Sequence, residues 1–197
     1  PQCTEINMDA TVASIEEKSD AQLRQLRQAG VKRLYLGIES GLDDVLAFMH
    51  KDHTIEQAYR QIARIQDLGF IYDAHMMTGI AGRGRGQENA EQIAAFFNRT
   101  QPGRIINFSL FLHRIAPLYR DIQKGTFIPA DELENLEEER LLLKLLEMQH
   151  TEYDGFHDCI EFRVRGTLPQ DKLKMLSSLD KAIQQQKEQE PLVAFID

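Results

Sequence analysis

The chain has 197 residues, of which 42% are hydrophobic and 27% are charged, a composition typical of a globular protein rather than a disordered or fibrous one. Its net charge of −8 argues against electrostatic binding to nucleic acid or to an anionic membrane, because both need a basic surface. No apolar run is long enough to span a membrane. Cys3 and Cys159 are far apart and have no partners at metal-binding spacing, so we expect reduced thiols, no metal ligands and a cytoplasmic protein.

Predicted helices and strands alternate through the first 125 residues. Capping sequences at Ser19 and Thr54 begin two of the helices, and Gly30 and Gly69 end them. Repeated strand–helix units predict a parallel sheet with right-handed crossovers. Four such strands are too few for a closed barrel of eight, so we expect an open sheet or a partial (βα) barrel. These strands are predicted to start near residues 4, 33, 71 and 104.

One short strand, within Arg33 to Gly41, is apolar on both faces and ends in a carboxylate and a hydroxyl, those of Glu39 and Ser40. In parallel α/β folds, side chains at the carboxyl end of a strand point toward the ligand. Glu39 and Ser40 are therefore candidate ligand contacts. They could equally cap the helix that follows, and the spacing alone does not separate these two interpretations.

Two further strands carry polar groups where a buried sheet is expected. Asp73, His75 and Met77 share one face of their strand, and Asn107 lies within the next. A buried polar side chain needs a hydrogen-bond partner or a ligand. Any one of them is explained by a bond inside the sheet, but three strands that each contribute a polar residue (Glu39, His75 and Asn107) favour a binding site.

Two loops contain residues suited to binding an anion or a metal, but neither has the sequence motif of a known site. The loop from Gly79 to Gly86 joins a strand to a helix, where backbone amides can approach an anion. It fits neither the Walker loop nor the dinucleotide fingerprint, so a flexible turn is the better interpretation. His50 and His53 lie close together in another loop, but adjacent histidines rarely face the same way, and we predict no metal there.

The pattern changes after Gly125. Pro129 and Asp131 precede a long helix, whose acidic start we interpret as a solvated amino end favoured by the helix dipole. A strand from Ile160 to Val164 alternates in the manner of a half-solvated edge. Pro169 is suited to the first position of a last helix.

Two segments and one residue between them match the motifs of a known family in the same order. They are Leu34 to Gly41, Lys51, and Met77 to Gly82. Together they are similar to the second half of a radical S-adenosylmethionine (SAM) enzyme core, in the branch with the coproporphyrinogen-oxidase-like and Elongator-type members. The resemblance implies a partial (βα)₆ barrel, with SAM across the carboxyl ends of the strands beside a 4Fe–4S cluster held by a CxxxCxxC loop. Residues 1–125 would then be the carboxyl-terminal half of this core, and residues 126–197 a mainly helical extension with a possible edge strand.

The resemblance also implies roles for individual residues. Glu39 would contact the ribose or the methionine part of SAM, Lys51 would pair with the methionine carboxylate, and His75 would reach the ribose. Met77 and the turn from Gly79 to Gly82 would pack against adenine, and the strand around Asn107 would close the adenine side. The implied cofactor-binding residues are Glu39, Ser40, Lys51, His75, Met77, Gly79 and Asn107.

The chain lacks several sequence motifs of the family, and these absences determine what we expect it to do. It has neither the CxxxCxxC loop nor the glycine-rich second-strand motif, and Ala81 stands where the family often has proline. We therefore expect a carboxyl-terminal fragment that binds neither cluster nor cofactor and is inactive alone. Its parent would use an external reductant and cleave SAM to a 5′-deoxyadenosyl radical that acts on an undefined substrate.

Two other hypotheses stay open. The chain could belong to a (βα)-barrel lyase or aldolase that uses Lys51 or His75 in acid–base chemistry. It could also be a degenerate domain kept as a protein-binding scaffold.

Overall fold

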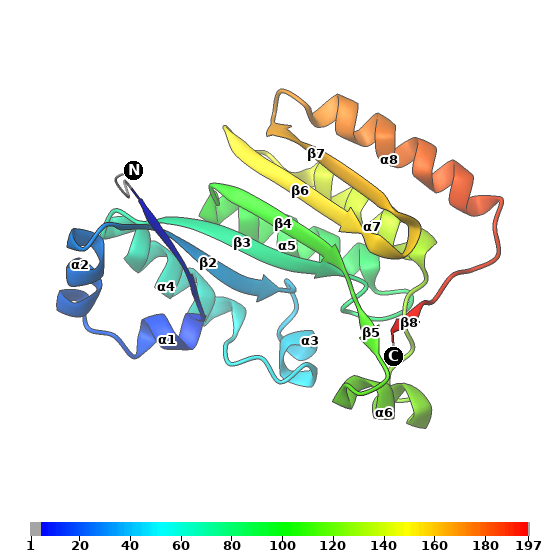
Figure 1. Cartoon of the computed structure of the whole chain (residues 1–197), viewed down its shortest axis with the longest axis horizontal. Coiled ribbons are helices and arrows are strands. Elements are labelled where there is room, and N and C mark those ends of the chain that lie inside the picture. The colour runs from blue at the N-terminus through cyan, green and yellow to red at the C-terminus, as the bar shows by residue number, and fades with distance from the viewer. Residues whose placement is uncertain (1–4, 197) are drawn as a thin grey trace.

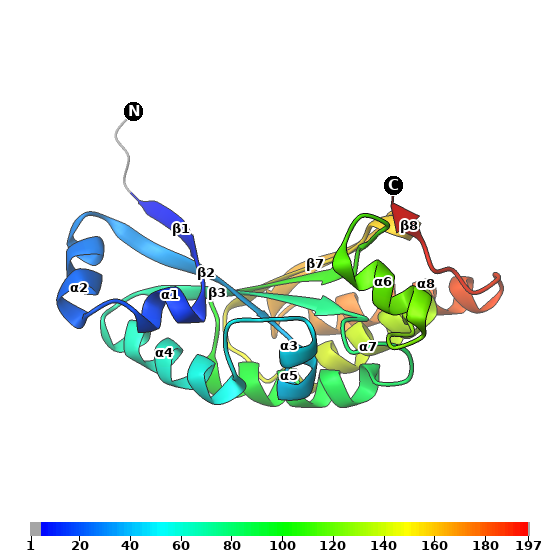
Figure 2. The same cartoon turned by 90° about the horizontal axis from the view of Figure 1, so that it is seen from below.

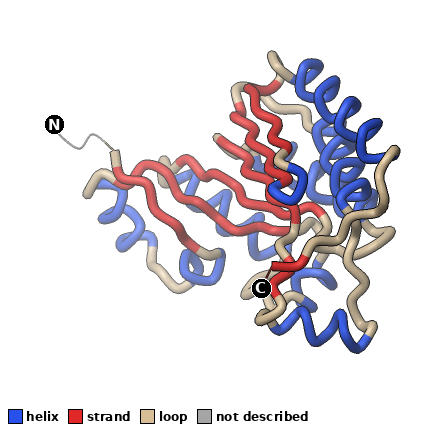
Figure 3. Tube along the Cα trace, turned by 45° about the vertical axis from the view of Figure 1, so that its right-hand side comes forward, coloured by secondary structure: helices blue, strands red, loops and turns tan. Residues whose placement is uncertain are grey.

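The computed structural model describes residues 5–196, which fold around a six-stranded sheet (Figure 1). All neighbouring strands pair in parallel except the last two, which are antiparallel. The strands turn progressively across the sheet (Figure 3), as expected for part of a barrel. The predicted mostly parallel α/β partial barrel is confirmed. In order across the sheet, the strands are β1 (Ile6–Ala10), β2 (Val31–Glu39), β3 (Ile71–Thr78), β4 (Arg104–Ser109), β6 (Thr151–His157) and β7 (Phe162–Leu168).

Helices cover one face of this sheet and leave the other face open, as Figure 2 shows for α4, α5 and α7. Figure 1 looks onto the open face. The short strands β5 (Leu112–His113) and β8 (Phe195–Ile196) pair in parallel away from the main sheet. No helix within residues 5–196 has both the length and the apolar character needed to cross a membrane. The helices are α1 (Val12–Glu16), α2 (Asp20–Gln28), α3 (Asp43–Phe48), α4 (Ile55–Asp67), α5 (Gly86–Thr100), α6 (Pro117–Lys124), α7 (Glu132–Leu145) and α8 (Lys172–Lys187).

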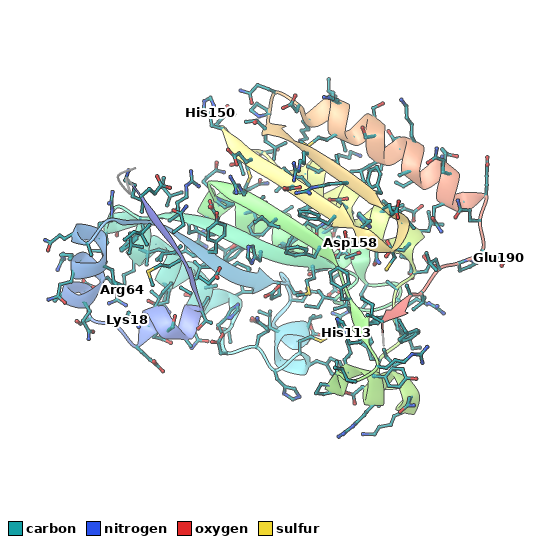
Figure 4. All side chains as sticks on the ribbon, in the orientation of Figure 1. Lys18, Arg64, His113, His150, Asp158 and Glu190 are labelled. Atoms are coloured by element: carbon teal, nitrogen blue, oxygen red, sulfur yellow. The ribbon has the colours of Figure 1, made fainter. Side chains whose placement is uncertain are left out.

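Local sequence signals account for where the early helices begin. Ser19 and Thr54 each form a complete capping box at the start of α2 and α4, as predicted. Arg64 of α4 then holds the connection between α1 and α2, because its guanidinium donates to the carbonyl oxygens of Ile15 and Lys18 and pairs with Asp20. Figure 4 shows Arg64 beside Lys18. The amino-terminal helices are thus fixed to the sheet through α4.

The period of two along each strand divides the sheet into two faces. In β2, Leu34, Leu36 and Ile38 are almost completely buried against the helices, and in β3 Ala74 and Met76 lie on the same side. Burial of a side chain of this size contributes about 1.5–3 kcal/mol to stability. The residues between them face the open side, so this face carries the polar and aromatic groups.

In the carboxyl-terminal part, two predicted elements begin later than expected. The strand expected at residues 160–164 begins instead at Phe162, after a 3₁₀ turn (Asp158–Ile160). Pro169 does not begin the last helix, because Asp171 accepts a hydrogen bond from the Thr167 amide in a turn before α8 starts at Lys172.

Strand β6 was not predicted at all. Its helix-facing positions include Thr151, Gly155 and His157, which leave no apolar alternation to recognise. The sheet therefore continues past residue 125 into β6 and β7. The division of the chain into two units at that position stays a prediction.

Candidate functional site

Glu39, the last residue of β2, has a backbone conformation that residues other than glycine rarely adopt. Its φ is 66°, and its side chain is buried. One carboxylate oxygen, Oε2, has no hydrogen-bond partner among the described residues. A left-handed non-glycine residue costs about 1–3 kcal/mol, and such strain concentrates at functional sites. The unpaired oxygen adds a second cost, which a ligand that donates a hydrogen bond would remove.

Lys51 supplies the partner of the other oxygen. Its ammonium nitrogen lies 3.1 Å from Glu39 Oε1. The carboxylate folds back over Gly37, where a Cβ atom would lie only 2.4 Å from Oε1. Any larger residue at position 37 would push the carboxylate away. The loop that carries Lys51 is held in turn by a hydrogen bond from the Lys51 amide to the carbonyl oxygen of Leu46.

His75 lies on the same open face. In the parallel register it is opposite Gly37, the residue over which the Glu39 carboxylate folds. Its imidazole lies between two aromatic rings, with centroids 5.6 Å from Tyr35 and 6.0 Å from Phe108. The structure therefore brings together Glu39, Lys51 and His75, the three residues on which the predicted site most depends.

The rings beside His75 extend into a row that crosses the open face. Phe108 stacks on Phe156 with centroids 5.3 Å apart and planes inclined by 11°. Arg163 places its guanidinium 3.7 Å from the centre of the Phe156 ring, in a cation–π contact. We call Tyr35, His75, Phe108, Phe156 and Arg163 the aromatic row. The far end of the aromatic row was not predicted, because β6 was not recognised from the sequence.

Met77 helps to build the rim of the site. It packs against a small apolar cluster that includes Ile80 and Ala81. A cleft of about 380 Å³ lies beside this cluster, between α3 and the loop that starts at Gly79. Phe48 and Phe127, whose rings stack with centroids 5.9 Å apart, form part of its wall. The cleft has the size of a small-molecule pocket, and its lining mixes apolar side chains with the charged Asp44, Arg83 and Arg85.

Ser40 and Gly79 are directed toward the helices, not toward the open face. The Ser40 hydroxyl donates to Oδ1 of Asn89 at 2.6 Å and accepts from the Leu42 amide, in the manner of a turn cap. The Gly79 amide donates to Oε2 of Glu138 at 2.8 Å. Leu42, not Ser40, is the N-cap of α3 and no side chain caps that helix, so Ser40 braces the turn before the helix, while Glu39 remains directed to the open side.

Asn107 is separated from the other candidates. It is opposite Met76 in the register, and it therefore lies on the helix-covered face. Its amide nitrogen donates to Glu139 at 3.1 Å, and its oxygen accepts from the Thr78 amide at 3.1 Å. The structure does not bring Asn107 together with Glu39 and His75.

The acidic start of α7 is not solvated, and that prediction is wrong for three of its carboxylates. Glu132, Glu138 and Glu139 are buried, and His157 of β6 lies between two of them. Its Nδ1 atom is 3.0 Å from Glu132, and its Nε2 atom is 2.9 Å from Glu139. The sequence analysis missed this cluster because the strand that carries His157 was not recognised. The helical pattern of α7 does not indicate that its carboxylates contact a histidine.

This burial changes the protonation of the cluster. Burial lowers the pKa of His157, but hydrogen bonds and charge from Glu132 and Glu139 outweigh it and raise the pKa to about 9. Burial raises the pKa of Glu138 to about 7, against the opposing effect of its bonds from the Gly79 amide and Asn89. At neutral pH, His157 is therefore a cation held between two carboxylates.

The residues fit an organic cofactor better than a metal. Glu39 offers an unpaired buried oxygen, and the cleft offers apolar walls. No group of three or more metal-ligating side chains is arranged around a common point within residues 5–196. His53 pairs with the neighbouring Asp52 at 3.1 Å. Cys159 is a free thiol whose pKa is raised by burial, and Cys3 lies outside the described residues.

The fold is a partial (βα) barrel, and Glu39, Lys51 and His75 lie together near the carboxyl ends of its strands. Residues 4–97 match the family model of the radical SAM superfamily. A curated relative, "tRNA uridine(34) acetyltransferase" from Methanocaldococcus jannaschii, is 22% identical over 119 residues, which are 60% of this chain and 22% of the relative.

A solved structure, "The archaeal Methanocaldococcus infernus Elp3 with N-terminus deletion (1-46)", has the same fold. It aligns with a TM-score of 0.69 and 16% identity over 95% of this chain and 43% of that chain. The chain therefore spans less than half the length of either protein. Over residues 4–97 the chain is therefore similar to the radical SAM superfamily, and its fold is similar to that of an archaeal Elp3, in line with the sequence resemblance.

Proposed function

We propose that the chain is the carboxyl-terminal part of a radical SAM enzyme and that its open rim forms half of the SAM pocket. The observation that carries this proposal is Glu39, which is buried, left-handed at its backbone and unpaired at one oxygen. Lys51 and His75 lie beside it on the same face. Strain and an unpaired acceptor at the carboxyl end of a parallel strand favour a ligand there.

Each group has a part of SAM that suits its chemistry. The ammonium of Lys51 pairs with the methionine carboxylate, and the free oxygen of Glu39 accepts a hydrogen bond from a ribose hydroxyl or from the methionine ammonium. His75 reaches the ribose. Met77 and the Gly79–Gly82 turn pack against adenine, and the neighbouring cleft is large enough for that ring.

The part of the reaction that this chain performs is binding and orientation. SAM held beside a reduced 4Fe–4S cluster would supply a 5′-deoxyadenosyl radical, and the cluster ligands would belong to another part of the parent protein. The residues of this chain would hold and orient the nucleoside. The parent would be an oxidoreductase-like enzyme that depends on a reductant, because the cluster must be reduced before SAM is cleaved. We expect the 197-residue chain alone to be inactive, because its sequence contains no CxxxCxxC loop.

The aromatic row suggests a class of substrate. A relative is named for its action on tRNA uridine, and the row offers flat rings and a guanidinium on which a planar base can stack. The net charge of −8 opposes broad electrostatic binding of RNA, so contact with tRNA would be confined to a few nucleotides around the target base.

The proposal is tested on the full-length protein, prepared without oxygen. We expect a CxxxCxxC motif upstream of Pro1, a brown preparation, and release of 5′-deoxyadenosine when a reductant and SAM are added. Addition of tRNA should increase that release. A colourless, inert protein whose gene lacks the motif would favour the scaffold hypothesis, and activity in air without iron would favour the acid–base enzyme.

A further inference from the structure

A buried chain of hydrogen bonds joins the ends of β2 and β3 through two helices. The Ser40 hydroxyl and the Gly41 amide both donate to Asn89 Oδ1, at 2.6 Å and 3.1 Å. Asn89 Nδ2 donates to Glu138 Oε1 at 2.7 Å, and the Gly79 amide donates to Glu138 Oε2 at 2.8 Å. We call Ser40, Gly41, Asn89, Glu138 and Gly79 the rim clamp.

The direction of every bond in the rim clamp is fixed. Asn89 must present its oxygen to Ser40 and its nitrogen to Glu138, and Glu138 accepts with both oxygens. Ser40 and Asn89 are completely buried, and Glu138 is 3% exposed, so water cannot replace a lost partner. A single wrong donor or acceptor would leave a buried group unpaired.

The clamp acts on residues next to the proposed SAM contacts. Ser40 directly follows Glu39, and Gly79 comes two residues after Met77. Gly86 lets the Glu138 carboxylate approach, because a Cβ atom there would lie 3.0 Å from Oε2. The carboxylate that holds both strand ends comes from α7, outside the residues 4–97 that match the family model.

We propose that Glu138 is a positioning residue: together with Asn89, it holds the ends of β2 and β3 at the spacing that SAM binding requires. This role rests on the proposed function, whereas the clamp itself does not. The carboxyl-terminal segment thereby becomes part of the cofactor site without touching the cofactor.

An exchange of the two polar groups tests the proposal. Glu138→Gln places two nitrogen donors against each other, and Asn89→Asp places two carboxylates against each other at a pH well above the Glu138 pKa of about 7. In the double variant, the new glutamine nitrogen donates to the new aspartate, which still accepts from Ser40 and Gly41, and the glutamine oxygen still accepts from Gly79. Both changes keep the size of the side chains. The matched control is Glu137→Gln, because Glu137 is half exposed and pairs with Lys187 at 3.3 Å.

The first readout is amide hydrogen exchange in the full-length protein without SAM, at a pH well above the Glu138 pKa of about 7, where this carboxylate is ionised. We expect each single variant to speed exchange about 10-fold or more in the segments 39–42 and 78–82, and the double variant and the control to match the wild type. Unchanged exchange in both single variants, or no recovery in the double variant, would overturn the clamp.

The second readout is the dissociation constant for SAM, measured anaerobically on the same proteins. It should rise about 10-fold in the single variants and recover in the double variant. Altered exchange with unaltered affinity would overturn the positioning role and leave the proposed function standing. A wild-type protein that exchanges as expected but binds no SAM would overturn the proposed function, and the positioning role with it.

Discussion

The carboxylate of Glu39 lies 3.1 Å from the ammonium of Lys51, and only one of its two oxygens is bonded among residues 5–196. The other oxygen is buried at the end of a strand whose backbone is left-handed at that residue. A residue selected for stability alone would avoid both features. Their combination is the reason to treat this strand end as a binding site.

Replacement of Glu39 by glycine should not destabilise the protein. Glycine relieves the left-handed φ of 66° and removes the unpaired oxygen, which together offset the lost ion pair and the added freedom of the unfolded chain. We expect the free energy of unfolding, measured in urea, to stay unchanged or rise by up to about 1 kcal/mol. Ile38→Ala is the control, because Ile38 is completely buried and its truncation should lower stability by about 2–5 kcal/mol. A loss in Glu39→Gly as large as in the control would contradict the account.

Gly79 and Gly84 form a matched pair for the turn that precedes α5. Both have positive φ, 79° and 77°, but a Cβ atom at Gly79 would lie 2.4 Å from Asn135 Oδ1, whereas at Gly84 it would meet open space. Alanine at either position adds backbone strain of about 1 kcal/mol. Gly79→Ala should lower the free energy of unfolding by about 1–3 kcal/mol more than Gly84→Ala does. The measurement is the melting temperature, which should fall further in Gly79→Ala. Equal drops would show that Asn135 yields freely.

His157 should make stability depend on alkaline pH. Its folded-state pKa of about 9 lies above the ordinary value of 6.5, so its stabilising contribution is complete below pH 6.5 and is lost as pH rises through 9. The shift corresponds to on the order of 3 kcal/mol. In His157→Gln, urea unfolding should show a lower free energy than the wild type at pH 6, and the difference between the two proteins should shrink as pH rises to 10. If the variant lost as much free energy of unfolding at alkaline pH as the wild type, that loss would not come from His157.

Glu138 should titrate close to neutrality. Its folded-state pKa of about 7 lies above the ordinary value of 4.5, so its charged form is disfavoured by folding. The contribution of Glu138 to stability is therefore largest below pH 4.5 and declines as pH rises through 7. Carboxyl carbon NMR of the labelled protein should show one glutamate with a midpoint near 7, and that signal should be missing in Glu138→Gln. If every glutamate titrated below pH 5, the burial of this carboxylate would be refuted.

The sequence predicted the parts of the fold in which local signals agree with packing. Capping boxes at Ser19 and Thr54 and the apolar strand ending at Glu39 are readable because cap, period and burial coincide. Strand β6 was missed because His157 and Gly155 occupy positions where an apolar residue is the usual signal. Their reason for being there is the carboxylates of α7, which contact them only in three dimensions.

The same limit applies to the site. Glu39, Lys51 and His75 could be grouped because each follows or lies near the carboxyl end of a parallel strand, where topology brings side chains together. Asn107 has a similar polar character, but strand alternation alone does not say which face is covered by helices. The register with Met76 places it on the covered face.

The most direct test of the account is calorimetric titration of SAM into the anaerobic full-length protein with its cluster reconstituted. Glu39→Gln and His75→Ala are compared with the wild type and with Arg60→Gln, a control at an exposed residue of α4. We predict affinity at least about 10-fold weaker in the two rim variants and unchanged affinity in the control. Equal affinity in all four proteins would show that the cofactor does not bind at this rim.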